Sequence, residues 1–119
     1  MDRVDQHDHL ALVLVWPRTS RPGVILGDAH AIRLHARPDT ADVAVTVADE
    51  IQGLGAGGTL IRTLAEVAQR EGITHFSATL LTSNTASQRM LASVGTVLAQ
   101  DCQGAMREMT VRLPPATTA

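Results

Sequence analysis

Four glycines lie within six residues in the segment Gln52-Gly53-Leu54-Gly55-Ala56-Gly57-Gly58. Glycine loses more backbone entropy on folding than other residues, so such a cluster predicts a specific role rather than a chance turn. A glycine-rich turn that opens a helix directs several backbone N–H groups toward one point, where the helix dipole adds about half a positive charge. The segment therefore predicts a phosphate or pyrophosphate site, and a merely flexible turn is the alternative.

Two common phosphate-binding motifs fit this segment poorly. Gly53, Gly55 and Gly58 match the spacing G-x-G-x-x-G, but residues 48–52 separate them from the preceding apolar segment. The dinucleotide fold turns almost directly into its glycines and ends the next strand on an acidic residue, which residues 80–82 do not supply. A P-loop requires a lysine, and all ten basic residues are arginine. A dinucleotide-binding module is therefore a weak hypothesis for this segment.

Around the glycines, the hydrophobic period changes from two to about 3.6 residues. Short β-branched segments separated by turn residues predict an antiparallel three-stranded meander before them. A helix, a strand parallel to the third, a second helix capped at Ser83 or Asn84, and a closing hairpin are predicted after them. The fold class is therefore α/β, with a mixed, mostly antiparallel sheet and two main helices. The predicted strands are 10–16, 24–35, 42–47, 74–81, 96–100 and 105–113, and the predicted helices are 58–70 and 83–94.

Length and composition limit the class of protein. The 119 residues suit one domain, with 1–9 as a flexible N-terminus, 10–113 as the folded part and 114–119 as a flexible tail. Only 2% of the residues are aromatic and the net charge is -2, which argues against nucleic-acid binding. The longest apolar run is too short for a membrane span, and one cysteine suits a reducing compartment. A cytoplasmic location is expected.

Residues 41–58, ADVAVTVADEIQGLGAGG, resemble the acetyl-CoA-binding core of the GNAT-type N-acetyltransferases. That core is a strand followed by Gln/Arg-x-x-Gly-x-Gly/Ala and a helix, and Gln52, Gly55 and Gly57 occupy the motif positions. Residues 80–95 are similar to a later segment of the family, in which Asn84 matches an asparagine that starts a helix. The resemblance covers about residues 10–113 and is closest to the bacterial protein-lysine acetyltransferase kind.

The resemblance implies acetyl transfer from acetyl-CoA, the co-substrate, to a primary amine by direct attack in a ternary complex, without a metal. In the family, two parallel strands splay apart beside the glycine loop and the pantetheine arm lies between them. By position, main-chain groups of Val45, Thr46 and Val47 would pair with that arm. The amides of Gly53, Leu54, Gly55, Ala56, Gly57 and Gly58 would hold the pyrophosphate, and Gln52 belongs to the same motif.

Asp42 is the first candidate for the base that deprotonates the amine, because it lies where the lysine-acetyltransferase kind usually carries glutamate. Its side chain is one methylene shorter, so a bridging water would complete the contact. A solvated carboxylate at the start of a strand is the alternative. Glu50 is the second candidate base, with an exposed loop position as its alternative. Asn84 is expected to contact the cofactor, to cap its helix, or both.

The chain departs from the family pattern at two places. Thr96 stands where a phenylalanine is usual, and the chain begins at what would be the family's second strand, so the acceptor side is expected to be truncated. A truncated, non-catalytic CoA-binding or interaction domain is therefore the alternative function. The sheet edge that a missing first strand would expose predicts a homodimer or a partner chain there.

The remaining chemistry-bearing side chains are expected to be structural or exposed. His7 and His9 lie in the expected flexible terminus, where metal binding would be adventitious. His30 and His35 are five residues apart, on opposite faces of one predicted strand, so they do not form a ligand pair. Cys102 is expected to lack an activating neighbour. Arg89, on the second helix, is a candidate for the 3′-phosphate of CoA, with a solvated helix face as its alternative.

Overall fold

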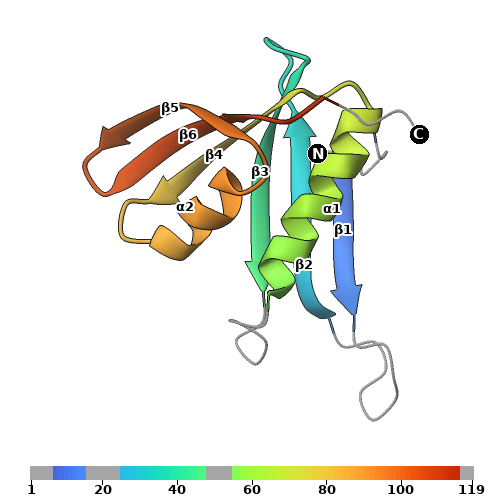
Figure 1. The fold of residues 1–119 in the computed structure, drawn as a ribbon, viewed down its shortest axis with the longest axis horizontal. Helices are drawn as coiled ribbons and strands as arrows, with labels where there is room; N and C mark the ends of the chain where they lie inside the picture. The colour runs from blue at the N-terminus through green and yellow to red at the C-terminus, as the bar shows by residue number, and fades with distance from the viewer. Residues whose placement is uncertain (1–6, 16–24, 48–54, 116–119) are drawn as a thin grey trace.

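The computed structural model describes residues 7–15, 25–47 and 55–115, and these form six strands and two helices in the predicted order (Figure 1). The sheet order is β1-β2-β3-β4-β6-β5, in which only the β3–β4 pair is parallel among the described strands. The predicted α/β class with a mixed, mostly antiparallel sheet is therefore confirmed. The elements are β1 His9–Val15, β2 Ile25–Arg33, β3 Thr40–Val47, α1 Ala56–Arg70, β4 His75–Leu81, α2 Thr85–Ala92, β5 Thr96–Gln103 and β6 Met106–Arg112.

Several boundaries differ from the predicted ones. β2 ends at Arg33 rather than at residue 35, because a tight turn follows it in which the Thr40 amide donates to the Arg37 carbonyl at 2.9 Å. α1 begins at Ala56 rather than at Gly58, so Gly57 and Gly58 belong to its first turn. β5 extends three residues beyond the predicted end, to Gln103.

One face of the sheet carries both helices. The buried side chains of α1, among them Leu60, Ile61 and Leu64, pack toward the side chains of β1–β3. Gln88 of α2 accepts a hydrogen bond from Arg107, which lies on the same face of β6 as the buried Met109 and Val111. Figure 1 shows α1 lying across β1, β2 and β3 with α2 beside it. The hydrophobic core therefore lies between this face and the helices.

The opposite face of the sheet, here called the open face, has no helix over it in the part of the chain that the structure describes. Side chains alternate along a strand, so residues that neighbour buried ones point to this face. On β2 and β3 they include His30, Ile32, Asp42 and Thr46, each next to buried alanine or valine residues or to residues packed against the core. The open face therefore carries polar and titratable side chains at the middle of the sheet.

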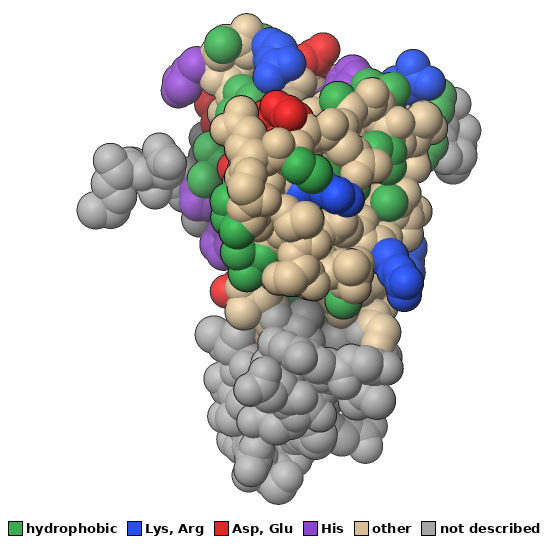
Figure 2. Space-filling model, turned by 90° about the vertical axis from the view of Figure 1, so that its left-hand side faces the viewer, with side chains coloured by type: hydrophobic (Ala, Val, Ile, Leu, Met, Phe, Trp, Pro, Cys, Tyr) green, Lys and Arg blue, Asp and Glu red, His purple; other side chains and the backbone are tan. Residues whose placement is uncertain are grey.

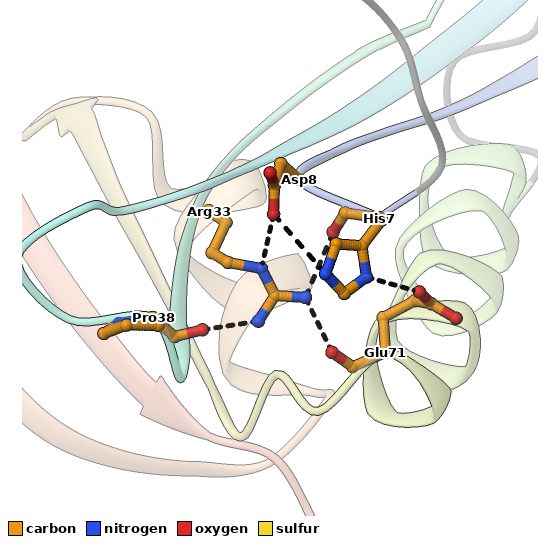
Figure 3. A network of polar contacts seen from close by, with 5 residues as sticks. All are labelled: His7, Asp8, Arg33, Pro38 and Glu71. Atoms are coloured by element: carbon orange, nitrogen blue, oxygen red, sulfur yellow. Dashed lines mark hydrogen bonds and ion pairs between the residues drawn. The ribbon is translucent and has the colours of Figure 1, made fainter.

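A network around Arg33 holds the start of β1 against the rest of the domain (Figure 3). The guanidinium donates to Asp8 Oδ1 at 3.1 Å and to the carbonyl oxygens of Pro38 at 2.5 Å, His7 at 3.1 Å and Glu71 at 2.6 Å. His7 Nδ1 also lies 2.7 Å from Glu71 Oε1. Within the expected flexible terminus, residues 7–9 therefore contact β2 and the end of α1.

No helix in the described ranges has the length and apolar character needed to cross a bilayer.

Candidate active site

β3 and β4 pair only at their beginnings. Their parallel register covers Thr40 with His75, Ala41 with Phe76 and Asp42 with Ser77, and it stops there. β3 continues to Val47 against β2, and β4 continues to Leu81 against β6. Each strand therefore follows its outer neighbour while the two diverge (Figure 1). We call the stretch of β3 after Asp42 and of β4 after Ser77 the splay.

The splay contains the main-chain segment expected to pair with a pantetheine arm. Val45 and Thr46 lie in it, and so does the backbone of Val47. Their partners on the other side are β2 residues, whereas no strand pairing joins them to β4 among the described residues. Unpaired strand edges present N–H and C=O groups that seek partners. An extended amide-containing ligand would meet this requirement.

α1 begins near the end of β3, on one side of the splay (Figure 1). Gly55 precedes the helix with a φ of 84°, and its carbonyl accepts from the Thr59 amide at 3.0 Å and from the Thr59 hydroxyl at 3.2 Å. The amides of Ala56, Gly57 and Gly58 precede this first helical bond, so they point out of the helix end. The first turn contains no acidic residue. This end of α1 can therefore receive an anion.

The other expected residues of the glycine segment and the second candidate base have no structural description. Gln52, Gly53, Leu54 and Glu50 lie outside the described residues. Their expected roles stay predictions.

Asp42 lies on the open face at the last paired position of β3 and β4. Its side chain stands between Ile32 of β2 and Ser77 of β4, and the Ser77 hydroxyl donates to its Oδ1 at 3.3 Å. The residue is exposed on this face, but partial burial between the strands raises the pKa of its carboxyl. The Ser77 hydrogen bond lowers this pKa and the charge of Glu108 raises it, so that the pKa is raised overall. Asp42 is thus a carboxyl group with a perturbed pKa at the origin of the splay.

Sequence reasoning did not identify Ser77 and Glu108. Ser77 faces Thr110 across the β4–β6 pair, and Glu108 lies two residues before Thr110 on the same face. The alternation of polar and apolar residues in the predicted strand 74–81 places Ser77 away from the core. The contact with Asp42 depends on the register of two strands far apart in the sequence, which the alternation does not give.

Asn84 is the N-cap of α2, and its Oδ1 accepts from the Ser87 amide at 3.1 Å. The capping alternative is therefore confirmed. α2 begins after β4, on the far side of the splay from the start of α1 (Figure 1). A contact between Asn84 and a cofactor stays a prediction.

Two expectations about the histidines and the cysteine need correction. His35 does not share a strand with His30 as expected, because β2 ends at Arg33, and His35 is exposed. His30 instead has a neighbour on β1, since its Nδ1 lies 3.1 Å from His9 Nε2. The β1–β2 register that brings them together is not visible in the spacing of residues. Cys102 does have a basic neighbour, because Arg107 Nε donates to its sulfur at 3.2 Å across the β5–β6 hairpin. The described residues include no group of three side chains suited to hold a metal ion.

Figure 2 shows the molecule from the β5–β6 side. Arginine and acidic side chains are interspersed there with hydrophobic and polar ones. The face shown therefore carries charges of both signs at separate points.

Comparisons with known proteins agree with this architecture. Residues 3–96 match the model of the acetyltransferase (GNAT) family. Acetyltransferase Pat of Mycolicibacterium smegmatis is 34% identical over 117 residues, which are 97% of this chain and 33% of the relative. The chain thus spans about a third of the length of this curated relative.

Solved structures show the same fold. A cAMP-binding acyltransferase from Mycobacterium smegmatis superposes with a TM-score of 0.76 at 29% identity, over 94% of this chain and 33% of that one. The structure of yncA, a putative acetyltransferase from Salmonella typhimurium with its cofactor acetyl-CoA, has a TM-score of 0.66 at 28% identity, over 81% of this chain and 62% of that one. With the family match over most of its length, this chain belongs to the acetyltransferase (GNAT) family, as a GNAT domain of the protein acetyltransferase kind.

Proposed function

We propose that this domain transfers the acetyl group of acetyl-CoA to a primary amine, on a small molecule or a protein lysine, by direct attack within a ternary complex. The observation that carries the proposal is the splay between β3 and β4, which begins at Asp42 and Ser77 and leads toward the start of α1. Family membership supports acetyl-CoA as the donor, and one similar structure contains it. A primary amine as the acceptor is what the resemblance to the N-acetyltransferases implies.

The splay and the start of α1 suit different parts of acetyl-CoA. The pyrophosphate is an anion, so the amides of Ala56, Gly57 and Gly58 are its natural partners. The pantetheine arm carries two amide groups, and the edge of β3 from Val45 to Val47 offers main-chain partners in an extended conformation. A cofactor bound in this way directs its thioester toward the origin of the splay, where Asp42 lies.

Deprotonation of the acceptor is the demanding step. A lysine-like amine with a pKa of ~10.4 is about 3.4 units too protonated at neutral pH, which corresponds to roughly 4.6 kcal/mol. Asp42 is the base that we assign to this step, acting through a bridging water, since its raised pKa makes it a stronger proton acceptor than an ordinary carboxylate. The thiol of CoA leaves with a pKa near ~8.5, so an acid for that group is less important. This suits a chain without tyrosine.

A non-catalytic CoA-binding domain is the second candidate function. The absence of tyrosine, a frequent general acid in this family, and the short Asp42 side chain favour it. The two functions differ in turnover, not in cofactor binding.

Thiol release from acetyl-CoA, measured with a panel of free amino acids, polyamines and lysine-containing peptides, tests the proposal. We expect release that depends on at least one amine and saturates with it. Calorimetric binding of acetyl-CoA without release for any amine would favour the second candidate. Binding of NAD in preference to acetyl-CoA would contradict both.

A further inference from the structure

Arg62 lies in the second turn of α1 and extends back along the helix toward its N-terminal end. Its Nη2 donates to the Thr59 hydroxyl at 3.4 Å. A Cβ atom placed on Gly58 would lie 3.1 Å from Arg62 Nη1, so the guanidinium rests directly over the bare Cα of that glycine. Helical side chains point toward the N-terminus, which explains how a residue four positions later reaches the first turn.

This position is electrostatically unfavourable for a cation without a counter-charge. The N-terminal end of a helix carries positive partial charge, so a guanidinium beside it is repelled. The first turn of α1 has no acidic residue, and in the described parts of the chain Arg62 takes part in no ion pair. Arg33, by contrast, has an aspartate and three carbonyl oxygens around its guanidinium (Figure 3). An incoming anion would remove the repulsion at Arg62.

We propose that Arg62 binds a phosphate group of the CoA nucleotide, in addition to the backbone amides at the start of α1. This inference rests on the proposed function, because it takes acetyl-CoA as the ligand of that site. A guanidinium presents a planar pair of N–H donors that matches two phosphate oxygens. Gly58 then has a second role besides exposing its amide: its missing side chain leaves room for the guanidinium. The phosphate is either the pyrophosphate or the 3′-phosphate of the ribose, which share the same recognition chemistry.

Isothermal titration calorimetry with acetyl-CoA and with 3′-dephospho-CoA tests the assignment on four variants, namely Arg62→Gln, Arg62→Lys, Gly58→Ala and the control Arg70→Gln. Arg70 is an exposed arginine in the last turn of the same helix, far from its N-terminal end. We expect Arg62→Gln to weaken acetyl-CoA binding about tenfold, as for a lost charge-assisted hydrogen bond, while Arg70→Gln leaves the affinity unchanged. Arg62→Lys keeps the charge without the planar donor pair and should lie between the wild type and Arg62→Gln.

The unliganded proteins give a second readout. Arg62→Gln removes a repelled cation and Gly58→Ala removes a helical glycine, so neither should lower the melting temperature. Gly58→Ala should nevertheless weaken acetyl-CoA binding by displacing the guanidinium. If it acts through Arg62, the double variant should bind no more weakly than Arg62→Gln alone.

The ligand comparison separates the two phosphates. A loss in Arg62→Gln that persists with dephospho-CoA assigns the pyrophosphate, and a loss that disappears assigns the 3′-phosphate. Equal acetyl-CoA affinities of Arg62→Gln and wild type would overturn the role of Arg62 while leaving the cofactor site intact. A wild-type protein that binds neither nucleotide would overturn the cofactor site, and the role of Arg62 with it.

Discussion

Asp42 is the residue on which the chemistry of the proposal depends most directly. Asp42→Asn keeps the size of the side chain and its place beside Ser77, but it cannot accept a proton. We expect kcat/KM at neutral pH to fall about 100-fold, the lower range for loss of a general base, with the Kd for acetyl-CoA unchanged. Steady-state thiol release and calorimetry measure the two quantities. Full activity of the variant would remove Asp42 as the base.

The same variant tests how the raised pKa of Asp42 affects stability, and the direction of the pKa shift gives the sign of the effect. An acid whose pKa is higher in the folded than in the unfolded state binds more protons when folded, so stability falls as the pH rises through the raised pKa. Asparagine does not titrate, so the stability of Asp42→Asn does not fall in this way as the pH rises. Its melting temperature should therefore equal or exceed that of the wild type at neutral pH, and the difference should vanish below the ordinary carboxyl pKa.

Ser77 and Glu108 should shift the pH dependence of the reaction in opposite directions. Ser77→Ala removes the hydrogen bond that lowers the pKa of Asp42, so the acidic limb of the kcat/KM profile should move to higher pH. Glu108→Gln removes a like charge, so the limb should move to lower pH. Profiles of kcat/KM against pH for the three proteins check this. Equal shifts, or none, would show that another group gives rise to the limb.

At the residue scale, the sequence pointed to Asp42 but not to the side chains around it. Asp42 was identified through the family resemblance, because it lies where the lysine-acetyltransferase kind usually carries glutamate, and its role as a base stays a prediction. Ser77 and Glu108 influence the pKa of Asp42 only because strand pairing brings them near it. Asp42 and Ser77 are more than thirty residues apart in the sequence, and their contact depends on the register of the strands. The contact of Arg107 with Cys102 was missed for the same reason, since it crosses the β5–β6 hairpin.

At the scale of elements, α1 has a left-handed glycine near each end. Gly55 has a φ of 84° and Gly72 a φ of 83°, and a Cβ on either would meet no atom within 4 Å. Gly55→Leu and Gly72→Leu should therefore cost similar stability, about 1 kcal/mol each for a side chain in the left-handed region. Gly55→Leu alone should also abolish acetyl-CoA binding, because its side chain occupies the space before the amides of the first turn.

Urea unfolding and calorimetry on this matched pair separate backbone strain from ligand contact. Equal affinity of the two variants for acetyl-CoA would contradict the assignment of the start of α1 as the phosphate site.

The order of the elements follows from periodicity and turn residues, and their boundaries depend on contacts that periodicity does not describe. The predicted helix begins at Gly58 because two further glycines weaken the helical pattern before it. In the structure Gly55 takes the left-handed conformation immediately before the helix, and Gly57 and Gly58 are helical. The splay itself was expected from the family resemblance, since hydrophobic pattern does not determine where parallel pairing ends.

For the whole molecule, the Arg33 network connects the start of β1, the turn after β2 and the end of α1 (Figure 3). Only 13% of the Arg33 side chain is exposed. Arg33→Met keeps the apolar volume but leaves three carbonyl oxygens without this donor, so we expect a loss of about 2 kcal/mol in the free energy of unfolding.

Arg37→Met is the matched control, because Arg37 is exposed and lies in the turn after β2. Urea denaturation should show no change for it. Equal stability of Arg33→Met and wild type would mean that the network does not hold the N-terminal segment against the domain.

We propose that acetyl-CoA lies between the diverging strands with its phosphates at the start of α1. Titration of the isotope-labelled protein with acetyl-CoA, followed by the chemical shifts of the backbone amides, tests it most directly. We predict saturable shifts at Val43–Val47 and at Gly55–Thr59, with little change near Glu71 and Gly72 at the opposite end of α1. Shifts confined to that opposite end, or no saturable shifts at all, would contradict the account.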